Sequence, residues 1–192
     1  MAYDLRMKSE HVKNRFLLAM PNLLFAGDYF RDTITYVCDH NDKGAMGIVV
    51  NRPLKLTVAD ILQQLELPNP ADVEGVVLEG GPVQRNAAII LHSDDVRVDK
   101  SVGVGDGLSL TAEIEMLAAI GRGQGPSQFI VALGYAGWGS GQLDGELAAN
   151  TWLTCRGSKS LIFDVPFDER LDTAAKTLGI DFSLMSGQPG NA

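Results

Sequence analysis

Several residue types are scarce in this 192-residue chain, and each shortage excludes a class of protein. Cys38 and Cys155 are the only cysteines, so the chain can build neither a disulfide framework nor a four-thiolate zinc site. The three histidines are far apart and show no ligand-like spacing, and we therefore predict no metal and no cofactor. Lys and Arg number 16 against 24 Asp and Glu, which gives a net charge of −8. This charge argues against high-affinity nucleic-acid binding, because such a chain repels phosphates on average.

Long apolar runs are also missing, since none reaches the roughly 20 residues that span a bilayer. Residues 16–26 follow several basic residues and superficially look like a signal peptide, but Pro21-Asn22 divides the run, and Asp4 and Glu10 dilute the positive segment. Two free thiols suit a reducing compartment. We therefore expect a cytoplasmic protein that is not associated with a membrane.

The remaining composition is that of an ordinary soluble globular protein. Apolar residues make up 45% and charged residues 21%, with a mean hydropathy of +0.04. No internal repeat, low-complexity block or linker interrupts the pattern. We predict one domain over residues 1–192, with a loose N-terminal arm at 1–15 and a flexible tail at 186–192.

Strand-like runs outnumber helical ones. Strands are predicted at Phe16–Ala19, Thr33–Cys38, Met46–Val50, Val76–Leu78, Ala87–Leu91, Val102–Leu110, Phe129–Leu133, Trp152–Cys155 and Leu161–Val165. Helices are predicted from Thr57 to Leu65, from about Thr111 to Gly121, from Leu147 to Asn150 and from about Asp168 to Leu178. The predicted fold class is α+β: a mostly antiparallel or mixed, curved sheet, covered by three or four helices.

Local signals set several of these boundaries. Turn residues 41–44 join the second and third strands into a hairpin, which places His40 opposite Ala45. Pro53 closes the third strand, because proline cannot donate to a strand ladder. Thr57 and Asp60 have the spacing of a capping box at a helix start.

The best candidate site combines polar strand ends with a glycine-rich segment at 134–145. Asn51, Arg52, Tyr135 and Trp138 are the predicted ligand-facing residues, with Arg52 as a possible anion clamp. A glycine loop between a strand and a helix can present backbone N–H groups to an anion, and the two aromatic rings could stack on a planar ligand. The same glycines also suit close packing of a helix and a strand around a buried tryptophan, which is the commoner arrangement.

Four further residues are fallback candidates: Cys38, His40, His92 and Asn150. Cys38 and His40 lie two apart, so a strand that continued through His40 would put the thiol and a base on one face. The commoner arrangement is a buried cysteine followed by a turn. No catalytic signature such as G-x-S-x-G occurs, and we lean against an enzyme.

The order of several motifs resembles the AlgH/YqgE family of bacterial proteins. The matching segments are residues 16–21, 39–41, 44–53, 80–83, 91–93, 134–138, 141–143, 150–153 and 178–180. Two positions depart from the family pattern. This chain reads Phe25-Ala26-Gly27 where members tend to have Asp-Pro, and it ends in Gly190-Asn191-Ala192 where they often end in Gly-His-Ala.

The resemblance implies an α+β fold and little about activity, since the family is largely uncharacterised. Its name comes from a proposed regulatory role in alginate synthesis, and members are often labelled transcriptional regulators. We therefore expect a non-enzymatic regulatory or binding protein that acts indirectly, through an unknown protein partner or small ligand. The alternative is a small-molecule binder or enzyme with a polar and aromatic pocket at strand ends. Direct DNA binding is the weakest hypothesis, because the chain shows neither a helix-turn-helix pattern nor a basic stripe.

Overall fold

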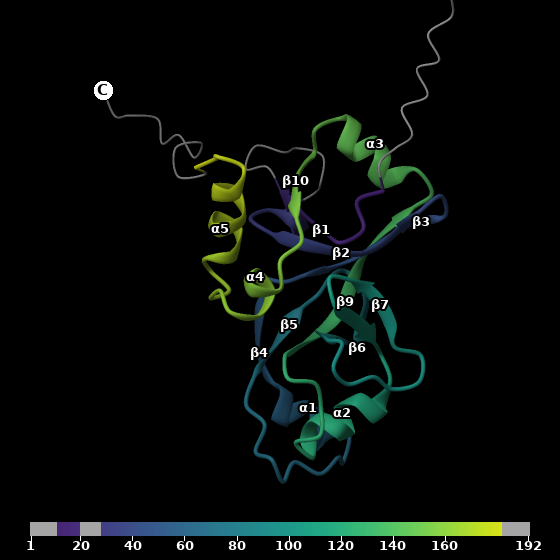
Figure 1. Cartoon of the computed structure of the whole chain (residues 1–192), viewed down its shortest axis with the longest axis vertical. Helices are drawn as coiled ribbons and strands as arrows, with labels where there is room; N and C mark the ends of the chain where they lie inside the picture. Colours follow the sequence, from purple (N-terminus) through teal and green to yellow (C-terminus); the bar gives the residue numbers. More distant parts are fainter. Residues whose placement is uncertain (1–10, 20–27, 182–192) are drawn as a thin grey trace, which may run out of the picture.

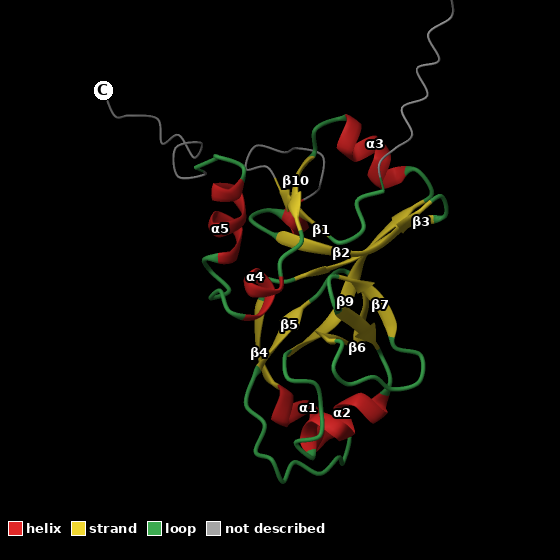
Figure 2. Cartoon of the chain, viewed as in Figure 1, coloured by secondary structure: helices red, strands yellow, loops and turns green. Residues whose placement is uncertain are grey.

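A continuous path of hydrogen-bonded strands runs through the computed structural model, which describes residues 11–19 and 28–181 (Figures 1 and 2). The path has the order β10-β1-β2-β3-β9-β6-β8-β7, and β4 and β5 join it beside β9. Every pairing is antiparallel except that of β5 with β9. The strands are β1 (Arg15–Ala19), β2 (Ile34–Asn41), β3 (Gly44–Val49), β4 (Pro53–Thr57), β5 (Val76–Glu79), β6 (Val83–Ser93), β7 (Val102–Gly105), β8 (Leu108–Thr111), β9 (Phe129–Gly139) and β10 (Trp152–Arg156).

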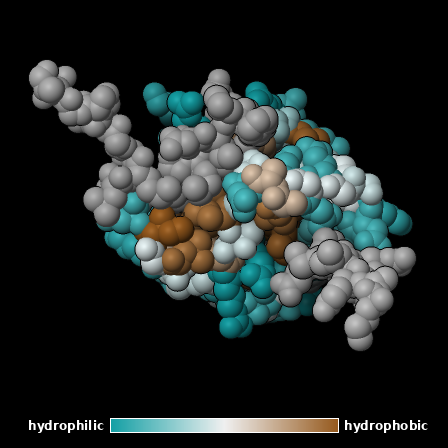
Figure 3. Space-filling view, turned by 90° about the horizontal axis from the view of Figure 1, so that it is seen from above, coloured by the Kyte–Doolittle hydropathy of each residue, from teal (hydrophilic) through white to brown (hydrophobic). Residues whose placement is uncertain are grey.

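Short helices pack around the two ends of this sheet. They are α1 (Val58–Gln64), α2 (Ile114–Gly121), α3 (Gln142–Ala148), α4 (Lys159–Phe163) and α5 (Arg170–Thr177), with a 3₁₀ turn, η1, at Asp28–Phe30. Helices α1 and α2 lie together at the lower end in Figure 1, whereas α3 and α5 lie at the upper end. Figure 3 views that upper end, where the described residues show hydrophobic groups separated by hydrophilic ones, a mixture that is normal for a protein surface.

Strand β9 connects the two ends of the molecule. Its first half pairs with β5 and β6, and its second half pairs with β3. Gly134 lies between the halves in the left-handed region at φ +71°, which glycine adopts without strain. A Cβ atom at Gly81 would lie 1.9 Å from the backbone carbon of Tyr135, so the chain crosses β9 at a distance that only glycine permits. These glycines bend a single strand and bring another segment of backbone against it.

Three hydrophobic clusters fill the interior on the two sides of the sheet. The largest includes Phe16, Tyr36 and Leu91, and helices α4 and α5 contribute to it. A second cluster lies beneath α1 and α2, and a third lies beneath α3 around Trp138 and Trp152.

Much of the predicted fold is confirmed. The class is α+β with a curled, mostly antiparallel sheet, the hairpin pairs His40 with Ala45, and the capping box of α1 is formed between Thr57 and Asp60. The described residues contain five α-helices rather than three or four, because residues 159–163 form α4 instead of the predicted strand. Ser158 caps this helix by accepting a hydrogen bond from the N–H of Leu161, 3.4 Å away.

Other boundaries were wrong. Strand β4 begins at Pro53, which pairs with Leu78 at the start of a short ladder. The predicted strand over 102–110 is a hairpin whose strands β7 and β8 flank Asp106-Gly107, and the next helix begins at Ile114 rather than near Thr111. The predicted glycine loop is largely strand, since β9 continues to Gly139, and α3 starts five residues earlier than the predicted helix at Leu147.

The N-terminal arm is packed where the structure describes it. Val12 is buried, the N–H of Asn14 donates to the carbonyl of Val37 at 2.9 Å, and β1 already begins at Arg15. The expectation of a loose arm is therefore wrong for residues 12–15. Residues 1–10 and the predicted tail at 186–192 lie outside the described residues.

Candidate functional site

Asn51 and Arg52 tie the end of β3 to the segment that precedes β2. The side-chain oxygen of Asn51 accepts from the N–H of Ile34 at 3.0 Å, and its amide nitrogen donates to the carbonyl of Asp32 at 2.9 Å. Arg52 donates to the carbonyl of Arg31 at 3.1 Å, and its guanidinium lies 4.8 Å from the ring centre of Tyr29. These contacts give both residues a structural role in holding the 28–32 turn.

Trp138 forms part of a buried clamp. Its indole N–H and that of Trp152 both donate to Oε2 of Glu146, at 2.9 and 2.8 Å, while Phe30 stacks on Trp138. Trp138 is only 7% exposed. The clamp fixes α3 onto β9 and β10, which matches the packing role considered for the glycine-rich segment.

The four predicted ligand-facing residues do not meet in one pocket of the described structure. Trp138 pairs with Ala45 at the turn end of the β2–β3 hairpin, whereas Asn51 and Arg52 follow the opposite end of β3. Tyr135 is half-buried against the largest hydrophobic cluster. None of these contacts requires a ligand. Ligand binding by Asn51, Arg52, Tyr135 and Trp138 therefore stays a prediction.

His40 and Cys38 lie on the same strand, and neither is arranged for nucleophilic chemistry. His40 Nδ1 accepts from the N–H of Val12 at 3.0 Å, so its proton resides on Nε2, which lies 3.5 Å from Asp144 Oδ1. The lone pair that a general base needs is therefore occupied. Burial raises the pKa of the Cys38 thiol to about 12, which keeps it protonated at neutral pH.

The remaining fallback candidates are also held by the fold. His92 is fully buried, and its Nδ1 donates to the carbonyl of Ser93 at 2.8 Å. Its Nε2 is enclosed without a partner among the described residues. Asn150 occupies the left-handed region at φ +55° after α3, a position that asparagine tolerates at helix ends.

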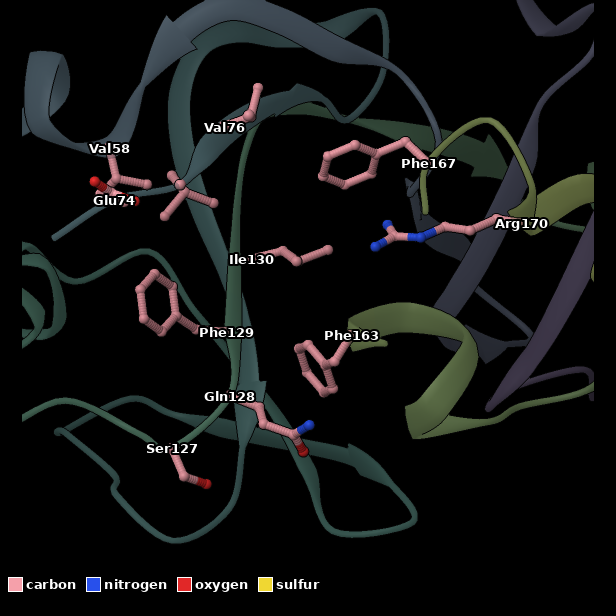
Figure 4. Close-up of a pocket in the computed structure, with 12 residues that line it drawn as sticks. Val58, Glu74, Val76, Ser127, Gln128, Phe129, Ile130, Phe163, Phe167 and Arg170 are labelled. Atoms are coloured by element: carbon pink, nitrogen blue, oxygen red, sulfur yellow. The ribbon is translucent and has the colours of Figure 1, made fainter. Parts of the chain in front are cut away.

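A pocket of about 330 Å³ opens between the starts of β5 and β9 and the α4–α5 segment (Figure 4). Its apolar lining includes Ile130, Phe163, Phe167 and Val76. Gln128 and Ser127 add polar groups at one edge, and Glu74 lines the pocket at the other side. This volume lies at the lower end of the range for small-molecule sites.

The side chain of Arg170 reaches into this pocket from the start of α5 (Figure 4). It is only 3% exposed and stacks over the Phe167 ring at 4.3 Å. Its Nε donates to the carbonyl of Val165 at 2.9 Å, and its Nη1 donates to the carbonyl of Val50. Nη2 makes no hydrogen bond with any residue of 11–19 or 28–181, so part of the guanidinium stays available to a guest in the pocket.

Arg170 also lacks a counter-ion among the described residues, where the ion pairs present involve other side chains. Burial lowers the pKa of Arg170 to about 10, so the group remains a cation at neutral pH. A buried, unpaired cation is costly unless hydrogen bonds or an anion compensate it. The wall of the pocket therefore contains a guanidinium that two backbone carbonyls hold in place.

Little in the amino-acid sequence indicates this site. Arg170 stands in an amphipathic helix with other charged residues, where an exposed side chain is the normal expectation. Phe163 and Phe167 of the pocket precede that helix, and the sequence alone places them in the hydrophobic core. The one usable signal was that Arg170 lies one turn before the buried Ala174, on the same helix face.

Two further features are absent from the described residues. No group of three or more His, Cys, Asp or Glu side chains in 11–19 and 28–181 is placed to hold a metal ion. In the same part of the chain, no helix is long and apolar enough to cross a membrane.

Comparisons with known proteins agree on one group of relatives. A family model described as AlgH-like matches residues 16–183. A "UPF0301 protein" of Pseudomonas syringae pv. syringae is 43% identical over 190 residues, covering 97% of this chain and 99% of the relative. Another "UPF0301 protein", from Thiobacillus denitrificans, is 42% identical, with coverage of 97% and 100%.

Solved structures show the same arrangement. The solution structure of the AlgH protein from Pseudomonas aeruginosa is similar over 100% of both chains, with a TM-score of 0.75 and 37% identity. The crystal structure of a Corynebacterium diphtheriae protein shares the fold at 16% identity, with a TM-score of 0.72 and 93% coverage of each chain.

Proposed function

The chain belongs to the AlgH-like family, as its motifs indicated, and we propose that it is a non-enzymatic binding protein that takes a small organic anion at Arg170. The observation that carries this proposal is the buried guanidinium with one nitrogen still free to donate inside a pocket. Arginine suits this task because its planar fork pairs with carboxylates and phosphates.

Three contacts favour binding over catalysis. The lone pair of His40 Nδ1 already accepts a backbone N–H, the Nε2 of His92 is enclosed, and the Cys38 thiol is held protonated by burial. The pocket itself is lined mainly by Phe, Ile and Val side chains together with Arg170, and Glu74, Ser127 and Gln128 lie at its edges. Such a lining can select and hold a ligand.

We further propose that the protein acts in the cytoplasm as an indirect regulator, through contact with a protein partner. The two free thiols support a reducing compartment, and the name of the family supports regulation. The charge of −8 supports a protein rather than DNA as the target. A mobility-shift titration near physiological salt should give no sequence-dependent band at nanomolar protein, and the appearance of one would reinstate direct DNA binding.

The pocket can be tested with two simple anions, benzoate and phenyl phosphate. A probe at ten times its Kd stabilises the folded protein by about 1.4 kcal/mol. In a domain of this size that corresponds to a rise in melting temperature of about 3–6 °C. We expect at least one of the two probes to produce such a saturable rise in the wild type.

Arg170 is a poor residue for a first test, because its hydrogen bonds to two carbonyls also support the fold. Val76 lines the pocket and is 39% exposed, so Val76→Trp can fill the pocket without disturbing the core. Val102 is 59% exposed on β7 and does not line this pocket, which makes Val102→Trp a matched control. The rise should disappear in Val76→Trp and persist in Val102→Trp. A rise in melting temperature that persists in both variants would refute the proposal. So would a wild-type protein that responds to neither probe.

A further inference from the structure

We infer that the ligand of this pocket is a monocarboxylate with an apolar, preferably flat body, rather than a phosphate ester or another polyanion. This inference rests on the proposed function and names the chemical class that the same site selects. It follows from how many donors the pocket offers, what charge surrounds them, and what the rest of the lining is made of.

The donors that Arg170 can offer are few. Nε is used by the carbonyl of Val165, and one Nη1 proton is used by the carbonyl of Val50. What remains is the Nη2 amino group and one proton of Nη1. Donors on two neighbouring nitrogens of a single guanidinium suit the two oxygens of one carboxylate.

The charge around Arg170 also limits the ligand. No second basic residue lines the pocket, whereas Glu74 does. Glu74 is exposed and forms no ion pair within the described structure, so the side chains that line the pocket carry no net positive charge. A pocket with one positive and one negative side chain favours a monoanion over a dianion such as a phosphate monoester.

The lining beside the guanidinium is apolar. Figure 4 shows Ile130, Phe163 and Phe167 on the same side of β9 as the guanidinium of Arg170. Two of these three side chains are aromatic, and Phe167 already stacks on the cation. A flat or branched hydrocarbon body next to the carboxylate would bury its surface against these residues. A small acid without such a body would leave them facing water.

Three probes separate these determinants: 4-methylbenzoate, phenyl phosphate and acetate. Calorimetric titration of the wild-type protein at neutral pH should give 4-methylbenzoate the lowest Kd. We expect its Kd to be about tenfold or more below that of acetate, because of the buried ring. We expect its Kd to be about fivefold below that of phenyl phosphate, because Glu74 is exposed and the repulsion is partly screened.

Glu74→Gln isolates the charge selection without touching the core. It should reduce the preference for 4-methylbenzoate over phenyl phosphate and leave the affinity for 4-methylbenzoate nearly unchanged. Glu66→Gln is the matched control, since Glu66 is also an exposed glutamate but does not line the pocket, and it should leave the preference as in the wild type.

The outcomes distinguish failure of the inference about ligand class from failure of the proposed anion binding. Tighter binding of phenyl phosphate than of 4-methylbenzoate, or equal binding of acetate and 4-methylbenzoate, would overturn the inference and leave anion binding at Arg170 intact. A preference that is unchanged in Glu74→Gln would also overturn it. If none of the three probes binds saturably, the proposed function fails, and the inference fails with it.

Discussion

Glu146 accepts hydrogen bonds from both Trp138 and Trp152, and we predict that losing this clamp lowers the stability of the fold strongly. Glu146→Leu keeps the volume of the side chain but leaves the indole N–H groups of Trp138 and Trp152 without an acceptor. Both rings are less than 10% exposed, so water cannot fully replace the lost bonds. Each buried donor left unpaired costs about 1–3 kcal/mol, and the variant should therefore lose about 2–6 kcal/mol of unfolding free energy.

Urea unfolding measures this loss directly. Trp138 and Trp152 are the only tryptophans of the chain, so their fluorescence reports the clamp, while far-ultraviolet circular dichroism reports the whole fold. Glu146→Gln keeps one acceptor oxygen and should lose much less than Glu146→Leu. Glu115→Leu is a control on the exposed side of α2. A loss below about 0.5 kcal/mol in Glu146→Leu, the size of an ordinary surface effect, would refute the clamp.

Three further predictions concern acid stability, thiol reactivity and backbone packing. Hydrogen bonds from Ser93 and Ser127 lower the pKa of Asp95 to about 2, below its unfolded value, so its stabilisation is present above about pH 4 and is lost as the pH falls towards 2. Urea midpoints should therefore fall less between pH 4 and pH 2 in Asp95→Asn than in the wild type, and an equal fall would contradict this. Burial raises the pKa values of both cysteine thiols, so Ellman's reagent should label neither in the native protein at pH 8 and both after denaturation; rapid native labelling would disprove their burial. Gly81→Ala should cost about 3 kcal/mol or more, because the new Cβ meets the backbone of β9, whereas Gly145→Ala in α3 meets nothing and should gain about 0.5–1 kcal/mol; similar urea midpoints for the two variants would argue against the close crossing.

The strands were predictable where a local pattern was enough. The β2–β3 hairpin follows from β-branched residues on either side of turn residues, and the capping box of α1 follows from Thr57 and Asp60. Residues 161–165 were predicted wrongly because a short apolar run suits a buried strand and a buried helix equally well. The cap at Ser158 and packing against the sheet decide for the helix.

The glycine-rich segment shows a different limit. Glycine permits a loop that cradles an anion, and it equally permits a bent strand against which another backbone packs closely. Only the tertiary contact of Gly81 with Tyr135 distinguishes the two, and no local pattern contains it.

The site was harder still, because it depends on which side chains the fold leaves unsatisfied. Asn51, Arg52 and Trp138 had the right chemistry for a ligand, but backbone carbonyls and Glu146 use their hydrogen bonds. Arg170 has the same chemistry, and it differs from Arg52 because it is buried in the wall of a pocket. Burial of that guanidinium without a counter-ion is a property of the packed structure, and the sequence shows only an arginine in a helix.

The most direct test of the central claim is to observe Arg170 itself during ligand binding. In a ¹⁵N-labelled sample, the Nε–Hε resonance of Arg170, assigned with Arg170→Lys, can be followed while benzoate is added. An anion on the guanidinium predicts a saturable shift of this resonance, with the same Kd as the shift of the Ile130 methyl groups across the pocket. A saturable benzoate response elsewhere with an unmoved Arg170 resonance, or no saturable response at all, would contradict it.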